Sequence, residues 1–210
     1  MLKNPQDRRA KRTAMQIKET TLSLMESKAI HEIRVSEICK VCQINRATFY
    51  DHYRDVFDLV QDMEMDILLA LQELMETVSP EAMPPERVSG LFFAFLAEHR
   101  RNMRLLINSE RSREFCIRLD AVIMPFFEKK IRQTYVIPEG MEAQLHCAMQ
   151  FVAAGYYRFF MLALSEDARE ISADGALCVR LSNACLDLLF AQKQKTAAGT
   201  DGSAWDIPGL

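Results

Sequence analysis

The chain has 210 residues, a formal net charge of −3, and 49% hydrophobic residues. A chain of this length and composition can bury a sizeable core, which excludes a disordered protein. It has only 7 Gly and 7 Pro, and runs of alternating polarity are scarce, so we expect an all-α fold. Because we see neither a signal peptide nor an apolar run long enough to span a bilayer, we expect a cytoplasmic protein with reduced thiols and no membrane partner.

The charge is unevenly distributed along the chain. Residues 1–56 hold 11 Lys or Arg against 7 Asp or Glu, whereas residues 57–210 hold 15 against 22. A basic front on an acidic body is typical of proteins that neutralise nucleic-acid phosphates locally, with ordinary variation in surface charge as the alternative. Residues 1–11 are expected to form a flexible basic arm that could contact DNA phosphates or the minor groove, or simply a solvated terminus.

Residues 35–53 carry the most informative pattern of the chain. Their apolar spacing predicts two short helices around a tight turn, and the second helix opens at Asn45, a favourable N-cap. Phe49 and Tyr53, four residues apart, can anchor that helix inward. With a preceding helix over residues 12–28, the pattern predicts a three-helix helix-turn-helix DNA-binding domain over residues 12–54.

The residue types in this stretch also resemble a known family. The motif Ile-x-Val-x-x-Ile-Cys-x-x-Cys-x-Ile-Asn-Arg-x-Thr-Phe-Tyr-x-His-Tyr, which runs from Ile33 to Tyr53, is similar to the DNA-binding signature of TetR/AcrR-like transcriptional regulators. Two positions depart from that family. Gln43 stands where the family usually has Gly in the turn, so it must adopt a left-handed conformation or the turn must differ. Val56 stands where the family often has a phosphate-contacting Lys, and Arg54 is the nearest substitute.

Several residues of this domain are candidates for contacting DNA. Arg46 can donate two hydrogen bonds to a guanine edge, and Ala47 could touch a thymine methyl. Tyr50 and His52 match positions that contact phosphate in the family. Arg34 and Ser36 lie at the start of the preceding helix, where the helix dipole favours a phosphate, and which of them caps the helix stays open. The predicted DNA-binding residues are Arg34, Ser36, Asn45, Arg46, Ala47, Thr48, Tyr50, His52 and Arg54.

Cys39 and Cys42 form a Cys-x-x-Cys pair, which can indicate a metal or redox site. A zinc site needs further ligands, and we see no second pair or nearby His pair in the sequence. We therefore expect buried structural thiols, no metal and no cofactor.

The remaining chain reads as a helical effector-binding and dimerisation domain over residues 55–193. A long helix over 55–78 is followed by a Pro-rich break over 79–85 and by helices over 86–99, 103–107, 111–135, 141–164 and 175–193. This makes about nine helices, with Pro125 expected to kink or divide one of them. The tail over 194–210, which holds Trp205, is expected to be disordered. The stripe predicted to be buried on the long helix is Phe57, Val60, Met63 or Glu64, Ile67, Leu71, Leu74 and Val78.

Two residue sets in this domain carry functional predictions. A pocket for a small apolar or aromatic effector is predicted from Phe92, Phe95, Met103, Met124, Phe127, Tyr156 and Phe160, with plain core as the alternative. A homodimer interface, as the family resemblance implies, is predicted at Phe151, Ala154, Gly155, Phe159, Leu181, Cys185 and Leu188, with the core of the monomer as the alternative.

Together these patterns predict a transcriptional regulator without enzymatic activity. The resemblance implies a ligand-responsive homodimeric repressor that reads a palindromic operator in double-stranded DNA. One alternative is an interaction module that keeps the fold without binding DNA. Another is an all-α enzyme acting on a hydrophobic substrate, although we see no phosphate-binding Gly-rich loop or metal-ligand cluster in the sequence.

Overall fold

The computed structural model describes residues 5–78, 85–165 and 171–192. The described chain is almost entirely helical, which confirms the expected all-α class. In chain order its helices are α1 (Pro5–Met25), the 3-10 turn η1 (Ile30–Glu32), α2 (Val35–Cys42), α3 (Arg46–Tyr50), α4 (Val56–Thr77), α5 (Pro85–Ile107), α6 (Ser112–Thr134), α7 (Glu142–Ser165) and α8 (Ile171–Asp187). None of the described helices is both long and apolar enough to cross a bilayer.

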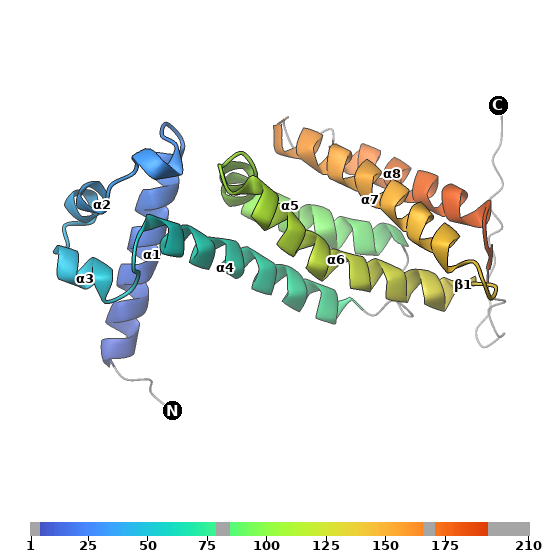
Figure 1. Cartoon of the computed structure of the whole chain (residues 1–210), viewed down its shortest axis with the longest axis horizontal. Helices are drawn as coiled ribbons and strands as arrows, with labels where there is room; N and C mark the ends of the chain where they lie inside the picture. Colours follow the sequence, from blue (N-terminus) through green and yellow to red (C-terminus); the bar gives the residue numbers. More distant parts are fainter. Residues whose placement is uncertain (1–4, 79–84, 166–170, 193–210) are drawn as a thin grey trace.

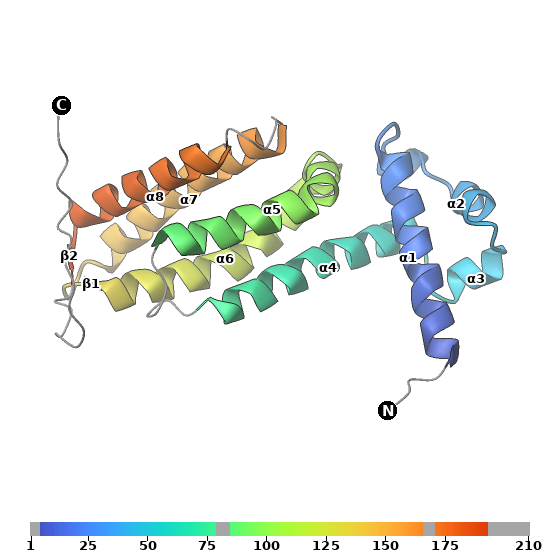
Figure 2. The ribbon, with the colours of Figure 1, turned by 180° about the vertical axis from the view of Figure 1, so that it is seen from behind.

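The helices gather at two ends of an elongated molecule (Figure 1). We call α1, η1, α2 and α3 the N-terminal unit, and α5 to α8 the helical body. The long helix α4 leaves the N-terminal unit and runs along the body, beside α5 and α6 (Figure 2). The N-terminal unit therefore projects from one end of the body.

Several helix boundaries differ from the predicted ones. α1 begins at Pro5, so residues 5–11 are helical and do not form the expected flexible arm. Proline is favoured at the first position of a helix because its missing N–H has no partner there. α5 continues to Ile107 and includes the segment predicted as a separate short helix, because no Gly or Pro interrupts it after residue 90. α6 continues through Pro125 as one helix.

A small β-ribbon, which the sequence pattern did not predict, closes the far end of the body. Strand β1 (Tyr135–Val136) pairs antiparallel with β2 (Ala191–Gln192), so the last helix ends at Asp187 rather than near residue 193. The Tyr135 hydroxyl donates to Asp187 Oδ1 at 2.9 Å, and Gln192 Nε2 donates to the same oxygen at 2.7 Å. Residues 79–84 of the predicted break and the predicted tail with Trp205 lie outside the described residues.

The main hydrophobic cluster is continuous from the N-terminal unit into the body. It joins Ile38 and Phe49 to Phe95 and Phe115 through the buried face of α4. The predicted stripe on α4 is largely buried, but Phe57 is exposed. The buried positions are Val56, Leu59, Val60, Met63, Glu64, Ile67, Leu68, Leu71 and Met75. A second cluster, around Leu145, Met149 and Phe190, lies beside the β-ribbon.

Candidate nucleic-acid interface

The two short helices α2 and α3 enclose a tight turn at Gln43. Gln43 has φ 55° and ψ 40°, the left-handed conformation that the departure from Gly required. Its N–H donates to the Lys40 carbonyl at 3.4 Å, and the Ile44 N–H donates to the Cys39 carbonyl at 3.1 Å. This paired closure is a Schellman motif, with Ile44 packed on the core as its hydrophobic contact. The helix-turn-helix thus forms without glycine, at the cost of one strained residue.

Asn45 starts α3 as its N-cap, as predicted. Its Oδ1 accepts from the Thr48 N–H at 2.7 Å and from the Thr48 hydroxyl at 2.9 Å. Capping of this kind satisfies a backbone donor that the first helical turn leaves without a partner. The amide nitrogen of Asn45 and the lone pairs of the Thr48 hydroxyl are the groups that these bonds leave for a ligand.

One face of α3 is buried and the other is open to solvent. Phe49 is fully buried and lies with its ring centroid 5.9 Å from that of Tyr53, which is itself buried. Arg46, Ala47 and Tyr50 are exposed, and Tyr50 keeps 56% of its surface accessible. The arrangement presents a cation, a small apolar group and a phenol on one short helix.

The start of α2 adds further groups to this surface. Arg34 caps the helix with an extended backbone, and Ser36 lies inside the first turn, which settles their order. Both side chains are exposed. Because the first N–H groups of a helix lack intrahelical partners, this end of α2 suits an anion.

The residues after α3 divide between exposed and buried positions. His52 is half-buried, with its ring 6.0 Å from that of Tyr53, beside a cavity of about 380 Å³ that Asp58 and Asp62 also line. Arg54 is exposed, while its backbone N–H donates to Asp58 Oδ2 at 3.0 Å. Val56 is buried as the first residue of α4, so it makes no outward contact there.

The cations of the predicted basic arm lie in the first turns of α1, where a flexible segment was expected. Arg8, Arg9, Lys11 and Arg12 are exposed on α1, as is Lys40 at the end of α2. Pro5 was the available signal, because a proline is often the first residue of a helix. These cations add positive charge to the unit that carries α3.

Cys39 and Cys42 are free and buried, as expected. The Cys42 thiol donates to Thr20 Oγ1 at 3.1 Å, and Gln16 Nε2 donates to the Cys42 carbonyl at 3.2 Å. Burial raises the pKa of the Cys39 thiol, which makes it less reactive. Among the described residues, no group of three or more His, Cys, Asp or Glu is placed to hold a metal ion.

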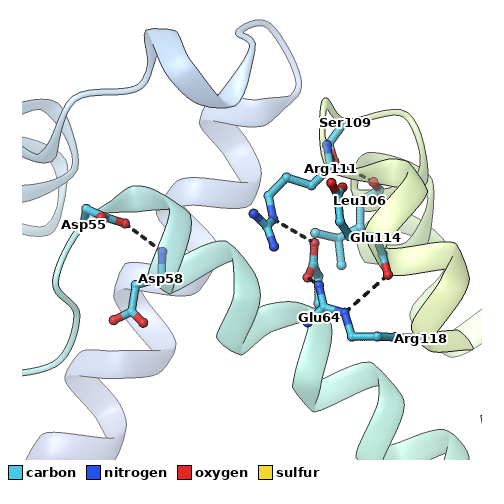
Figure 3. Close-up of polar contacts among 8 residues, drawn as sticks. All are labelled: Asp55, Asp58, Glu64, Leu106, Ser109, Arg111, Glu114 and Arg118. Carbon is cyan, nitrogen blue, oxygen red and sulfur yellow. Dashed lines mark hydrogen bonds and ion pairs between the residues drawn. The ribbon is translucent and has the colours of Figure 1, made fainter.

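Helix α4 is attached to the N-terminal unit by polar contacts on one face. Lys18 of α1 pairs with Asp62 at 2.7 Å and with Asp66 at 2.5 Å. The Tyr53 hydroxyl donates to Asp62 Oδ2 at 3.1 Å. Burial, together with the nearby carboxylates, raises the pKa of Tyr53 well above its usual range. The side chain of Asp55 caps α4 by accepting from the Asp58 N–H at 2.8 Å (Figure 3).

The opposite face of α4 carries a buried carboxylate that binds the body. Glu64 is fully buried, and each of its oxygens faces one arginine of the α6 region (Figure 3). Arg111 Nε lies 3.4 Å from Oε1, and Arg118 Nη2 contacts Oε2. Burial raises the pKa of Glu64, and the two guanidinium groups offset part of that rise. Opposite faces of the same two turns of α4 therefore hold the N-terminal unit and the body.

The described residues among those predicted for an effector pocket are divided between two hydrophobic clusters and a stacked pair of rings. Phe95 and Met103 are buried in the main cluster with Phe92 packed on it, whereas Met124 packs on the second cluster. The rings of Phe127 and Tyr156 stack with centroids 5.6 Å apart. The side chain of Phe160 lies outside the described residues. The cavity beside His52 and another between α1 and α5 are lined by other residues.

The residues predicted for a dimer interface lie mainly on the surface of α7 and α8. Phe151 is 72% exposed, Leu181 61% and Leu188 86%, so they are not core of the monomer. Ala154 and Gly155 are also exposed, and Phe159 and Cys185 are half-buried. No atom lies within 4 Å of the place where a Cβ on Gly155 would stand, so nothing within the described chain requires glycine there.

The fold and the exposed α3 define a helix-turn-helix unit joined to a helical body. No protein-family model matches this sequence, and no curated protein matches it. Solved structures are similar in fold. A TetR transcriptional regulator from Streptococcus agalactiae 2603V matches with a TM-score of 0.63 and 16% identity, over 89% of this chain and 98% of that one.

Two other solved structures extend the comparison. The complex of SmeT with triclosan matches with a TM-score of 0.63 and 12% identity, over 93% of this chain and 99% of that one. The dihydroxyacetone kinase operon activator DhaS matches with a TM-score of 0.57 and 18% identity, over 85% and 98%. The chain therefore has the fold of the TetR/AcrR-like transcriptional regulators, which confirms the resemblance of its motif at the level of fold.

Proposed function

We propose that this chain is a DNA-binding transcriptional regulator that reads its operator with α3. The observation that carries this proposal is the capped, inward-anchored α3, which leaves Arg46, Ala47 and Tyr50 open to solvent. A recognition helix of this kind enters the major groove with its N-terminal residues at the base edges. Such a protein acts where the DNA is, in the cytoplasm.

Each exposed group has a defined part in this proposal. Arg46 donates to a guanine edge, and Ala47 lets the helix approach closely enough to touch a thymine methyl. Tyr50 donates to phosphate, and Thr48 accepts from a donor on a base edge with its remaining lone pairs. Arg34 and Ser36 bind a phosphate of the DNA backbone at the start of α2. His52 and Arg54 flank the same surface, and the exposed cations of α1 add attraction that depends on salt.

We further propose that the regulator is a homodimer that reads a palindromic site. The exposed apolar residues of the neighbouring helices α7 and α8 are candidates for a symmetric contact, which would bury Phe151 and Leu181 against a second copy. Two recognition helices held at a fixed separation match two half-sites one helical turn apart.

The effector is the third part of the proposal. The aromatic residues of α5, α6 and α7, among them the pairs Phe92–Phe126 and Phe127–Tyr156, favour an apolar or aromatic small molecule. The similar SmeT structure is a complex with such a compound, triclosan. An effector acts only through unequal affinity for the DNA-competent arrangement and the released one, and we propose repression that the effector relieves.

Substitutions on α3 test the DNA-binding proposal. Arg46→Ala should weaken binding to DNA from the gene's own upstream region by about 1–3 kcal/mol, because it removes a bidentate base contact. Tyr50→Phe should cost about 1 kcal/mol and leave the salt dependence unchanged, because it removes one neutral hydroxyl from phosphate and no charge. Titration by fluorescence anisotropy at several salt concentrations measures both effects.

Arg113→Ala provides the control, because Arg113 is an exposed arginine on α6, outside the proposed interface. It should bind DNA like the unaltered protein, and all variants should keep the same helicity and oligomeric state. Unchanged affinity in Arg46→Ala and Tyr50→Phe would refute the assignment of α3 as the reading helix. Failure of the unaltered protein to bind any upstream DNA would favour the interaction module without DNA binding.

A further inference from the structure

A single arginine of the body binds three side chains, two on α1 and one in the turn directly after it. Arg101 of α5 donates from Nε to Glu26 Oε1 at 2.8 Å and from Nη2 to Ser23 Oγ at 3.0 Å, and its Nη1 contacts Glu19. Glu19 and Ser23 lie one turn apart on the same face of α1, and Glu26 follows directly after its last residue. Every nitrogen of the guanidinium group is thus engaged by the N-terminal unit.

A second polar contact crosses the same junction further along. His31 of η1 contacts Glu110, which lies between α5 and α6. Between the two crossings lies a cavity of about 340 Å³ with walls from both parts of the molecule. Its lining residues are Met25, Glu26, Lys28, Ala29, Ile30, Arg104, Leu105, Asn108, Ser109 and Glu110. The junction between the N-terminal unit and α5 is therefore open in the middle and tied at its sides.

We propose that Arg101 is a positioning residue that clamps the N-terminal unit to the body independently of α4, and so sets the direction in which α3 is presented. The proposal rests on the proposed function, because direction matters only if α3 reads DNA. In a dimer, the separation of the two α3 helices must match the separation of two half-sites. A clamp on α1 fixes that separation in advance and reduces the ordering that DNA binding requires.

The ion pairs of the clamp are partly exposed to solvent, so they can be broken at a modest cost in free energy. The side chain of Arg101 is 38% exposed, and those of Glu19 and Glu26 are 64% and 46% exposed, so solvent and salt screen each pair. The strength of the contact lies in its geometry, because a planar guanidinium donates in several fixed directions at once. A lysine ammonium is a point charge on a flexible stem and cannot span the same three partners.

Arg104 offers a matched control on the same helix. It lies one turn further along α5 and lines the junction cavity, and its guanidinium makes no ion pair or hydrogen bond among the described residues. Arg101→Gln and Arg104→Gln therefore remove the same charge from neighbouring positions, and only the first removes a clamp. Arg101→Lys keeps the charge and removes the fork.

Hydrogen exchange measured by mass spectrometry tests, without DNA, whether Arg101 restrains the N-terminal unit. In Arg101→Gln, amide exchange over residues 18–33 should become about tenfold faster, while exchange in α7 stays unchanged. Arg101→Lys should resemble Arg101→Gln, and Arg104→Gln should resemble the unaltered protein. Exchange in Arg101→Gln that matches Arg104→Gln, or that rises uniformly over the whole molecule, would overturn the clamp.

Affinity for DNA from the gene's upstream region tests whether Arg101 positions α3 for binding. Arg101→Gln should weaken binding about fivefold or more, with Arg104→Gln unchanged at the same salt concentration. Faster exchange in residues 18–33 without any loss of affinity would overturn the positioning role. If the unaltered protein binds no DNA, the proposed function fails, and the positioning role fails with it. The exchange experiment still decides whether Arg101 clamps α1.

Discussion

At the scale of single residues, Gln43 shows how a residue other than glycine can close the turn of a helix-turn-helix. Its positive φ brings its side chain close to its own backbone, at a cost of about 1–2 kcal/mol. The turn persists because the two Schellman hydrogen bonds and the packing of Ile44 hold it. The folded state therefore contains the strain energy of Gln43, and a residue that fits this conformation should remove it.

Gln43→Gly should stabilise the protein by about 0.5–1 kcal/mol, because glycine adopts this conformation without strain. The gain is smaller than the full strain energy, because glycine also increases the conformational entropy of the unfolded chain. Urea unfolding measures the change. Gln43→Ala serves as the control, because alanine keeps the Cβ that causes the strain, and its stability should match that of the unaltered protein. A destabilising Gln43→Gly substitution would mean that the Gln43 side chain itself supports the turn.

At the scale of elements, α4 and α6 are joined by an ion-pair network whose carboxylate is more deeply buried than its two arginines. Glu64 is fully buried, whereas the side chains of Arg111 and Arg118 remain 25% and 27% exposed. A buried charge that loses its partners cannot reach water, but a partly exposed one can. The two sides of this contact should therefore respond differently to substitution.

Arg111→Met combined with Arg118→Met should cost about 3–5 kcal/mol, because the carboxylate then lies buried without a counter-charge. Glu64→Gln should cost less than half as much, because both arginines can turn toward solvent. The pKa of Glu64 is already raised by burial, so its proton binds more tightly in the folded state, and stability falls as pH rises above about 4.5.

Removing both arginines should raise the pKa of Glu64 further, so the deficit of the double variant should be larger at pH 7.5 than at pH 5. Urea unfolding at the two pH values tests this order. An equal deficit at both would show that the carboxylate is not the group responsible, and a larger loss in Glu64→Gln would reverse the assignment.

At the scale of the whole molecule, the body exposes large apolar side chains, whose contact with water is unfavourable in a monomer. Phe151 on α7, Leu181 on α8 and Leu188 directly after α8 are more than half exposed. Exposed apolar groups gathered on neighbouring helices indicate a contact surface. The proposed dimer would bury these side chains. It would also make the Arg101 clamp important, because the direction of α3 matters most when two copies must match one site.

Phe151→Glu or Leu181→Glu should weaken the dimer by about 2–4 kcal/mol, because each places a charge where the apolar surface is buried. Analytical ultracentrifugation over a concentration series measures the shift toward monomer. Leu69→Glu is the control, since Leu69 is 51% exposed on α4, away from α7 and α8. A dimer that tolerates both glutamates would show that another surface joins the two copies.

Local signals were sufficient to predict the N-terminal unit. The Asn45 cap and the Phe49 and Tyr53 anchors lie as predicted, because each depends on neighbours within a few residues. The thiols of Cys39 and Cys42 are buried as predicted, although the residues that cover Cys42, such as Thr20, come from α1. The alternation between helix and break also predicted the main helices of the body. Phe57 was assigned to the buried stripe of α4 incorrectly, because spacing alone does not tell which side of a helix is covered at its end.

Helical periodicity and helix caps are local properties, so the amino-acid sequence was enough to predict an all-α chain with a helix-turn-helix. The partners of the charged side chains could not be predicted in this way, because they come together only when distant helices pack. Arg101 and Glu19 are 82 residues apart, and Glu64 and Arg118 are 54 apart. The pairing of β1 with β2 is similarly distant. Contacts of this range depend on how whole helices pack, and that packing sums many small burial energies that no short sequence pattern encodes.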